Sequence, residues 1–423
     1  MHDLLAREDE VGYRARSKIF YVCYGQHPND SIYAENLLEF FRAAGVTAKA
    51  IRLASQNPQR ELLHCLNDST LGLIGLNTQL DHSWIDSDNF LDLAAAAGVP
   101  VLHWVLDHAS SRWRQFTKAT VQNSRFIFLS PFSEKYFRRY ALPGSLTACT
   151  VNTGPSHRSR VQQFTRDGFL SRGILCLIPI NLQRISGSLA DAMLRRKALD
   201  RKLATAVDFA CEQAYYELDD PLERHLEDAL VDADLALDNN LFNDAFQIIE
   251  DIVQIRRRQR VFEIAREFPV LIQSDESAAP FAEGGKARFE TDVSFQTTLA
   301  RMKSARAVLS TSRVNDEIHN RIQNGLNAGC VNIIENSAVN RSVLAHGQNA
   351  LFFNYRDEDM LREQLDTVCS NPRRAYELAE AGFALRDEAP FRFGGFHNIL
   401  ELAQMPFPAG SDSDLAPLPS PAL

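Results

Sequence analysis

Short apolar runs of strand length alternate with helix-patterned segments along the first part of the chain. Strands are predicted at residues 19–24, 47–53, 71–76, 99–106 and 125–130. The segment after the first of them, 31–44, carries apolar residues at helical spacing and ends at Gly45. Since parallel strands must be joined by crossovers of helix length, this alternation predicts a doubly wound α/β domain over residues 18–165.

The alternation resumes further along the chain, with strands predicted at 172–180, 268–273, 305–310 and 330–334. Between the first two of these, residues 188–267 contain no glycine and one proline, and their apolar residues recur at helical spacing. One crossover helix does not need this length. A second Rossmann-like domain is therefore predicted over residues 170–405, with a helical insertion at about 188–267. Residues 406–423, rich in proline, serine and aspartate, are expected to be a disordered tail.

Composition excludes several classes of partner. The net charge is -9, from 45 basic and 54 acidic residues, which argues against binding to nucleic acid. No apolar run approaches the roughly 18 residues of a membrane-spanning helix, and the first residues lack the apolar core of a signal peptide. The seven cysteines lie far apart, without zinc-type spacing. We therefore expect a cytoplasmic protein with no transmembrane segment, no metal site and a small ligand.

Polar residues gather after the predicted strand 305–310. This segment places His319, Asn320 and Arg321 at the start of a predicted helix that ends at Gly329. Binding sites in open α/β sheets lie beyond the carboxyl ends of the strands, where helix N-termini present N–H groups to anions. An arginine, a histidine and asparagines at such a place suit a diphosphate or a sugar. The sequence has no phosphate-loop motif, no G-x-G-x-x-G after a strand and no G-x-S-x-G.

These residues carry a resemblance to a known family. The run 293–382 resembles the C-terminal nucleotide-sugar domain of GT-B-fold glycosyltransferases, in particular the CgeB-like, group-1 (family 4-like) enzymes. A His-x-Arg pattern that ends in glycine is matched from His319 to Gly329, and a Gly-x-Asn-x-Leu-aromatic turn from Gly347 to Phe352. The resemblance implies two Rossmann-like domains that face a cleft and a metal-independent hexosyltransferase. It also implies a nucleotide-sugar donor as substrate and no other cofactor.

The resemblance assigns the donor site to the second domain. The donor-binding candidates are His319, Asn320, Arg321, Asn324, Asp316, Asn336, Ser337, Asn340 and, after the strand 172–180, Arg184. Arg321 and His319 are the candidates for the diphosphate. Alternatively, Arg321 is a surface residue, His319 only starts a helix, and residues 336–340 form a plain polar turn.

One feature departs from the family pattern. Many retaining members have two glutamates eight positions apart, where this chain has Asp316 and Asn324. An amide cannot make the charge-assisted hydrogen bond of a carboxylate. The identity of the donor and the stereochemical outcome are therefore open.

In this fold the acceptor binds to the first domain, so the general base is expected there. Asp107 and His108 end the predicted strand 99–106 and are the first candidates. His27, after the first strand, is the next. Alternatively, Asp107 and His108 cap the following helix.

The function predicted from the sequence is transfer of a sugar from a nucleotide-sugar to a hydroxyl of a glycan, a protein or a small molecule. The alternative is a non-catalytic GT-B relative that binds nucleotide-sugar or acts as a scaffold. The Asp316 and Asn324 pair and the helical insertion support this alternative. An epimerase-like enzyme on the same fold is the third hypothesis. The insertion could form a homodimer interface, dock another protein or pack within the chain.

Overall fold

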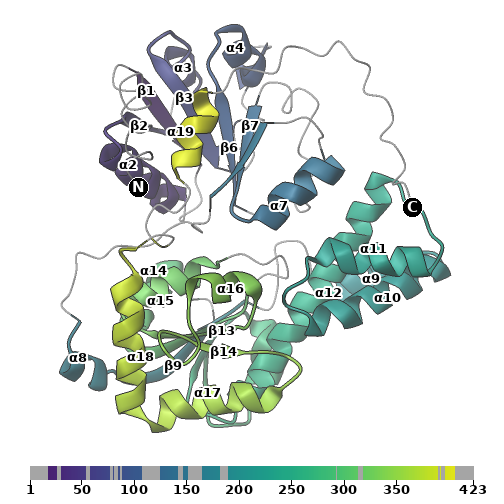
Figure 1. The fold of residues 1–423 in the computed structure, drawn as a ribbon, viewed down its shortest axis with the longest axis vertical. Coiled ribbons are helices and arrows are strands. Elements are labelled where there is room, and N and C mark those ends of the chain that lie inside the picture. The colour runs from purple at the N-terminus through teal and green to yellow at the C-terminus, as the bar shows by residue number, and fades with distance from the viewer. Residues whose placement is uncertain are drawn as a thin grey trace.

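Apolar runs form the strands of two parallel sheets, and amphipathic segments form the helices that cover them (Figure 1). The structure is a computed structural model. It describes residues 18–25, 30–53, 58–76, 80, 84–85, 88–106, 124–141, 146–150, 164–181, 189–291, 293–312, 318–388, 391 and 396–404. The α/β class and the two parallel sheets predicted from the sequence are confirmed.

The first sheet has six strands in the order β2-β1-β3-β6-β7-β8, and all its neighbours are parallel. The strands are β1 (Ile19–Tyr24), β2 (Thr47–Arg52), β3 (Thr70–Leu76), β6 (Val101–Val105), β7 (Ser124–Phe128) and β8 (Leu146–Cys149). The helices are α2 (Asp30–Ala43), α3 (Pro58–His64), α4 (Phe90–Ala96) and α7 (Pro131–Tyr136), which continues as the π-helical η2 (Phe137–Ala141). A short hairpin, β4 (Trp84–Ile85) and β5 (Asp88–Asn89), precedes α4. The central strands are buried along their whole length, which explains their nearly unbroken apolar sequence.

The second sheet also has six parallel strands, in the order β11-β10-β9-β12-β13-β14. They are β9 (Ile174–Pro179), β10 (Leu271–Gln273), β11 (Arg288–Glu290), β12 (Ala305–Ser310), β13 (Val331–Glu335) and β14 (Leu351–Phe353). The helices are α8 (Arg166–Leu170), α13 (Ala279–Ala282), α14 (Phe295–Lys303), α15 (Asn320–Ala328), α16 (Ala338–Val343), α17 (Glu358–Ser370) and α18 (Pro372–Leu385), with a 3-10 turn, η3 (Glu276–Ala278), before α13. The chain enters at β9 and adds strands first on one side and then on the other. The order therefore reverses between β9 and β12.

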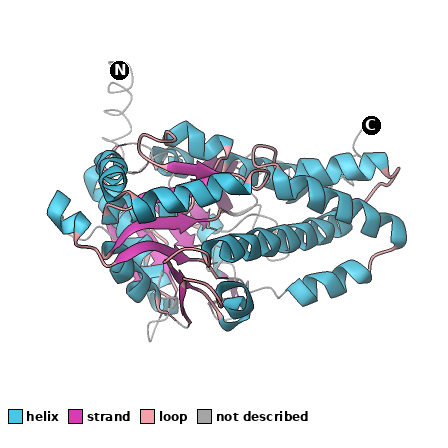
Figure 2. Ribbon diagram, turned by 90° about the horizontal axis from the view of Figure 1, so that it is seen from below, coloured by secondary structure: helices cyan, strands magenta, loops and turns pink. Residues whose placement is uncertain are grey.

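Four helices between β9 and β10 lie within the expected insertion. They are α9 (Leu189–Lys197), α10 (Arg201–Tyr216), α11 (Leu222–Asp232) and α12 (Asn239–Ala265), and they project to one side of the strands (Figure 2). The 27 residues of α12 give a length of about 40 Å at roughly 1.5 Å per residue.

The insertion joins the two halves of the molecule. The first part of α12 shares a hydrophobic cluster with β7, α7 and η2, and its last turns lie in the core of the second sheet. At the near end, the ring of Phe242 stacks on Tyr140 at 4.3 Å between centroids, and the Tyr136 hydroxyl donates to Asn243 Oδ1. Of the roles left open by the sequence, packing within the chain is therefore observed for this face. A homodimer stays a prediction.

The chain returns to the first sheet at its last described helix, α19 (His397–Gln404). This helix lies in the upper half of Figure 1, and Phe396 just before it contacts Phe40 and Trp104 edge-on, with centroids 5.2 and 5.3 Å apart. Arg125 Nη1 donates to the Ala403 carbonyl at 2.9 Å. Residues 396–404 were placed in the second domain by the predicted boundary 170–405. Their apolar face completes the core of the first sheet instead.

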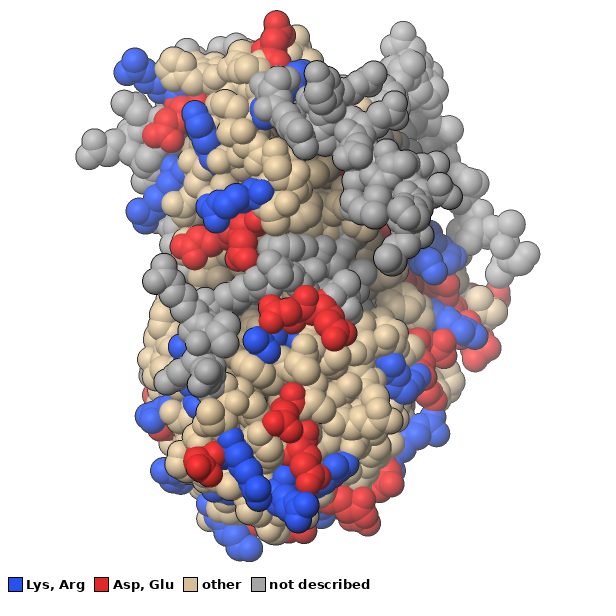
Figure 3. All heavy atoms as spheres, turned by 60° about the vertical axis from the view of Figure 1, so that its left-hand side comes forward, with Lys and Arg blue, Asp and Glu red and all other residues tan. Residues whose placement is uncertain are grey.

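Charged residues of both signs are interspersed on the lower half of the face shown in Figure 3. Within the basic run 256–260, Arg260 pairs with Glu263 at 2.6 Å and also with Glu358. No helix in the described part of the chain is long and apolar enough to cross a membrane. The same residues contain no group of three or more His, Cys, Asp or Glu arranged to hold a metal ion. The predicted tail, 406–423, lies outside the described residues.

Candidate functional site

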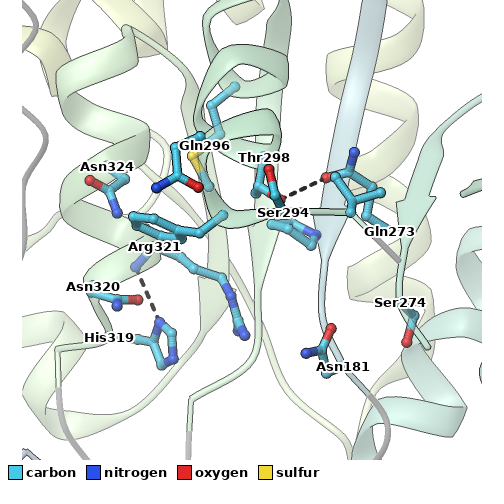
Figure 4. A pocket seen from close by; sticks show the side chains of 14 residues that line it. Asn181, Gln273, Ser274, Ser294, Gln296, Thr298, His319, Asn320, Arg321 and Asn324 are labelled. Carbon is cyan, nitrogen blue, oxygen red and sulfur yellow. Dashed lines mark hydrogen bonds between the residues drawn. The ribbon is translucent and has the colours of Figure 1, made fainter. Parts of the chain in front are cut away.

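A pocket of about 490 Å³ opens beyond the carboxyl ends of β9 and β10 in the second sheet. Helix α15, which follows β12, forms its opposite wall, so the pocket lies where the strand order reverses. This crevice is where open α/β sheets bind ligands, and the volume falls in the usual range of small-molecule sites. The lining residues are Pro179, Asn181, Gln273, Ser274, Val293, Ser294, Phe295, Gln296, Thr298, Met302, His319, Asn320, Arg321 and Asn324 (Figure 4).

The wall formed by α15 begins at His319. This residue is the N-cap of the helix, and its Nδ1 accepts a hydrogen bond from the backbone N–H of Arg321 at 3.1 Å. Since Nδ1 is the acceptor, the neutral ring carries its proton on Nε2. His319 is thus both the helix-start residue of one alternative and a residue of the pocket wall.

Arg321 and Asn324 lie three positions apart on the face of α15 that lines the pocket. Asn324 is only 3% exposed. The helix can lie this close to the sheet because residue 325 is glycine. A Cβ at that position would come within 2.4 Å of Asn332 Oδ1 on β13 and 2.6 Å of Val308 on β12. Gly329 ends the helix in the left-handed conformation, with φ of 65°. The glycines of the predicted pattern therefore have packing and capping roles.

The other walls come from β10 and α14, which the sequence did not suggest as parts of the site. Ser294 caps α14 by accepting from Thr297 N–H at 3.1 Å. The Gln273 amide is oriented from both sides, because its Nε2 donates to Glu290 at 3.0 Å and its Oε1 accepts from Thr298 at 3.2 Å. Gln273 and Ser274 could have been found, since they stand at the end of a predicted strand and just after it, as the residues before α15 follow theirs. The serine cap before Phe295, Leu299 and Met302 was the available sign of α14.

The described lining is polar and carries no carboxylate. Its charge-bearing side chains are Arg321 and His319, and five carboxamides accompany them: Asn181, Gln273, Gln296, Asn320 and Asn324. The N-termini of α14 and α15 both face the pocket, and each adds a partial positive charge. At the start of α15 the His319 ring already accepts a hydrogen bond from the backbone N–H of Arg321. The donors that this end of the helix offers to a ligand are therefore the Arg321 guanidinium and the His319 Nε2–H. The site therefore suits an anion that also offers several hydrogen-bonding groups.

Three donor-binding candidates lie away from this lining. Ser337 caps α16 by accepting from Asn340 N–H at 3.2 Å, and Asn340 is fully buried, with Nδ2 donating to the Glu335 carbonyl at 2.8 Å. The Asn336 carbonyl accepts from Arg341 at 2.7 Å. These contacts are those of the polar turn in the alternative interpretation, and donor binding by Asn336, Ser337 and Asn340 stays a prediction.

The remaining candidates are not located by the structure. Asp107, His108 and His27, proposed as bases, and Arg184 and Asp316, proposed for the donor, lie outside the described residues. The structure thus brings together four of the predicted donor residues, His319, Asn320, Arg321 and Asn324, in one pocket.

No protein-family model matches this sequence, and no curated protein matches it. Solved structures do. The DNA-modifying enzyme β-glucosyltransferase, determined in the presence and absence of its substrate uridine diphosphoglucose, is similar with a TM-score of 0.50 at 9% identity, over 91% of this chain and 99% of that one. Alr3699/HepE of Anabaena, in complex with UDP and glucose, gives 0.48 at 8% identity, over 92% and 98%. WaaG, a glycosyltransferase involved in lipopolysaccharide biosynthesis, gives 0.45 at 10% identity, over 91% and 99%. At such identities the likeness shows the fold alone: two parallel α/β sheets with their helices, in the GT-B arrangement.

Proposed function

We propose that this protein is a glycosyltransferase that binds a nucleotide-sugar in the pocket of the second sheet and transfers the sugar to a hydroxyl group. The observation that carries the proposal is the convergence of Arg321, His319 and two helix N-termini on a pocket at the strand-order reversal. In support, β-glucosyltransferase, which shares the fold, has uridine diphosphoglucose as its substrate. The CgeB-like subtype and independence from metal ions belong to the same proposal.

In the proposed reaction, the Arg321 guanidinium and His319 Nε2–H hold the donor's diphosphate. Negative charge grows on this group as the bond to the sugar breaks. Donors fixed in advance by the protein stabilise that charge without having to reorganise. Asn324 can bond to a hydroxyl of the donor, since an amide both donates and accepts. The acceptor, a glycan, a protein or a small molecule, would lose its proton to Asp107, His108 or His27 from the first half.

The test is nucleotide binding followed by turnover. The purified chain is titrated by calorimetry with UDP, GDP, dTDP, CDP and ADP and with the nucleotide-sugars that contain them. Replacing Arg321 with alanine should weaken binding by about 1.5 to 3 kcal/mol, which is about 10- to 100-fold, the usual effect of losing a charged hydrogen bond. Arg224→Ala is the matched control, because Arg224 is exposed and pairs with Asp220 at 2.8 Å in the helical insertion, away from the pocket lining.

Two results would contradict the proposal. If no nucleotide binds to the wild-type chain, the pocket is not a donor site. If Arg321→Ala binds as tightly as the wild type, Arg321 has no part in it. Binding of a nucleotide-sugar without hydrolysis or transfer, across a panel of acceptors, would favour the non-catalytic binding or scaffolding subunit.

A further inference from the structure

Glu335, at the carboxyl end of β13, is a buried carboxylate that is bonded on both oxygens. It is 1% exposed. Its Oε2 accepts from the backbone N–H of Ser312 at 2.6 Å, and its Oε1 accepts from the Tyr355 hydroxyl at 2.5 Å. A buried carboxylate is costly unless such partners stabilise it, so this arrangement is a specific feature of the fold.

The helical insertion contributes a positive charge that acts on Glu335. Arg257 of α12 lies over the Tyr355 ring, 4.9 Å from its centroid, and its Nε donates to the Tyr215 carbonyl at 3.1 Å. Burial raises the pKa of the Glu335 carboxyl, and the charge of Arg257 opposes that rise. Tyr355 thus lies between Arg257 of the insertion and Glu335 at the carboxyl end of β13.

Two neighbouring arginines of α12, Arg257 and Arg258, contact the carboxyl ends of the strands next to the pocket. Ser312, whose amide Glu335 holds, is the second residue after β12, and the same connection reaches the N-cap of α15 at His319. The next residue of α12, Arg258, donates to the carbonyl of Asn181, which lines the pocket beyond β9. The insertion therefore contacts the chain just beyond β9 and, through Glu335, just beyond β12. These two strands flank the strand-order reversal.

We propose that Glu335 is a positioning residue of the pocket: by holding the Ser312 amide, it places the start of the connection that carries His319 and Arg321. Glu335 is not among the lining residues, so it acts through the backbone and not by contact with a ligand. This inference rests on the proposed function where it concerns nucleotide binding. Its structural part, the placement of Ser312 and of the first turn of α15, can be measured without any ligand.

Three variants separate the contacts. Glu335→Gln keeps an oxygen for the Ser312 amide and offers its NH₂ to the Tyr355 oxygen, but it removes the charge that faces Arg257. Glu335→Ala removes both acceptors, and Tyr355→Phe removes one hydroxyl and leaves the Ser312 contact. The chain offers a matched control pair in α18, where the Tyr376 hydroxyl donates to the exposed Glu380. Glu380→Gln and Tyr376→Phe break the same kind of contact far from Ser312 in sequence and on the surface.

Two measurements on the full chain test the proposal: hydrogen exchange of peptides covering 312–322, and UDP affinity by calorimetry. We expect Glu335→Ala to raise exchange in these peptides at least about 10-fold and to weaken UDP binding by about 10-fold, the scale of one lost charged hydrogen bond. Glu335→Gln should recover most of both, Tyr355→Phe should have a smaller effect, and the two α18 variants should match the wild type.

A purely structural role would have a different signature. It would lower the midpoint of thermal unfolding and leave exchange at 312–322 and UDP affinity of the folded variants at wild-type values, which would overturn the proposal. If Glu335→Ala does not fold, Tyr355→Phe decides, because it removes one of the two hydrogen bonds that hold the Glu335 carboxylate, and unchanged exchange in this variant also overturns the proposal. If the wild-type chain binds no UDP or other nucleotide, the proposed function fails, while the exchange data still decide whether Glu335 places this segment.

Discussion

At the scale of single residues, the pocket depends on one side chain with two roles, that of His319, and on a glycine, Gly325, that has no side chain. His319 fixes the first turn of α15 with one nitrogen and faces the pocket with the rest of its ring. Gly325 contributes by having no side chain, which lets α15 lie against β12 and β13. The positions of Arg321 and Asn324 therefore depend on residues that need not touch a ligand.

This predicts a penalty for filling the space at Gly325. Gly325→Ala should lower the free energy of unfolding by about 1 to 3 kcal/mol, the usual cost of overpacking, because neither Asn332 nor the sheet behind it can move freely. Urea unfolding measures this. Gly173→Ala is the control, since nothing lies within 4 Å of a Cβ at that position. An unfolding curve for Gly325→Ala that equals that of Gly173→Ala would show that the helix can shift at no cost.

At the scale of elements, the interface between the insertion and the helices α7 and η2 contains a carboxyl group with unusual titration. Glu223, in the first turn of α11, is 8% exposed. Burial raises its pKa to about 7, against the opposing charges of Arg139 and Lys135 on the first half. The two halves therefore meet at a group that changes its charge near neutral pH.

The sign of the pH effect follows from the raised pKa. The folded chain holds the Glu223 proton up to about pH 7, whereas the unfolded chain loses it near 4.5, so this group's contribution to stability falls as the pH rises through that window. Glu223→Gln should behave like the wild type near pH 5 and be more stable at pH 8. The limit is about 3.5 kcal/mol, from about 2.5 pH units at about 1.4 kcal/mol each.

The measurement is the difference in urea unfolding between wild type and Glu223→Gln from pH 5 to 8. Taking the difference removes the other titrating groups, such as His225, whose pKa is lowered by burial. Glu283→Gln, at an exposed position, serves as the control. A difference that stays constant with pH would mean that Glu223 titrates normally.

At the scale of the whole molecule, the first sheet is completed by the last described helix. Arg125 is buried in β7 and donates to the end of α19, and its pKa is lowered to about 10 by burial. The free-energy cost of burying the Arg125 charge is compensated partly by the carbonyl groups at the C-terminus of α19, where a positive charge is favourable.

Arg125→Leu should therefore loosen α19 specifically. We expect faster proteolysis between residues 396 and 404 and a free energy of unfolding lower by about 2 to 4 kcal/mol, since a buried helix end loses its donor. Arg138→Leu, an exposed arginine in η2, is the control. Equal digestion rates in the two variants would show that apolar contacts alone hold α19.

The parts of this fold that the sequence predicted are those whose signal is local. Buried parallel strands such as β3 and β9 are nearly continuous apolar runs, and helix spacing identified the insertion. The packing of α19 on the first sheet was missed because its partner strands lie more than two hundred residues earlier, and nothing in the sequence of α19 indicates which strands it contacts.

The site divides in the same way. His319, Asn320, Arg321 and Asn324 follow a strong strand and match a family pattern, so they were predicted together. The wall from Gln273 to Thr298 was missed because the end of the predicted strand 268–273 and the serine cap of α14 match no recognised motif, and β11 between them is only three residues long. The role of Glu335 depends on Tyr355 and Arg257, which become its neighbours only after the insertion has packed.

The return of α19 also sets an order on biosynthesis. A ribosome releases the six strands of the first sheet by residue 149, but Phe396, whose ring packs on Trp104, and the helix α19 after it are synthesised only by residue 404. Domains synthesised first generally fold first. Here the earlier half has to wait, with part of its core uncovered, through the synthesis of the entire later half, so a chaperone that shields this surface has the whole of that interval in which to act.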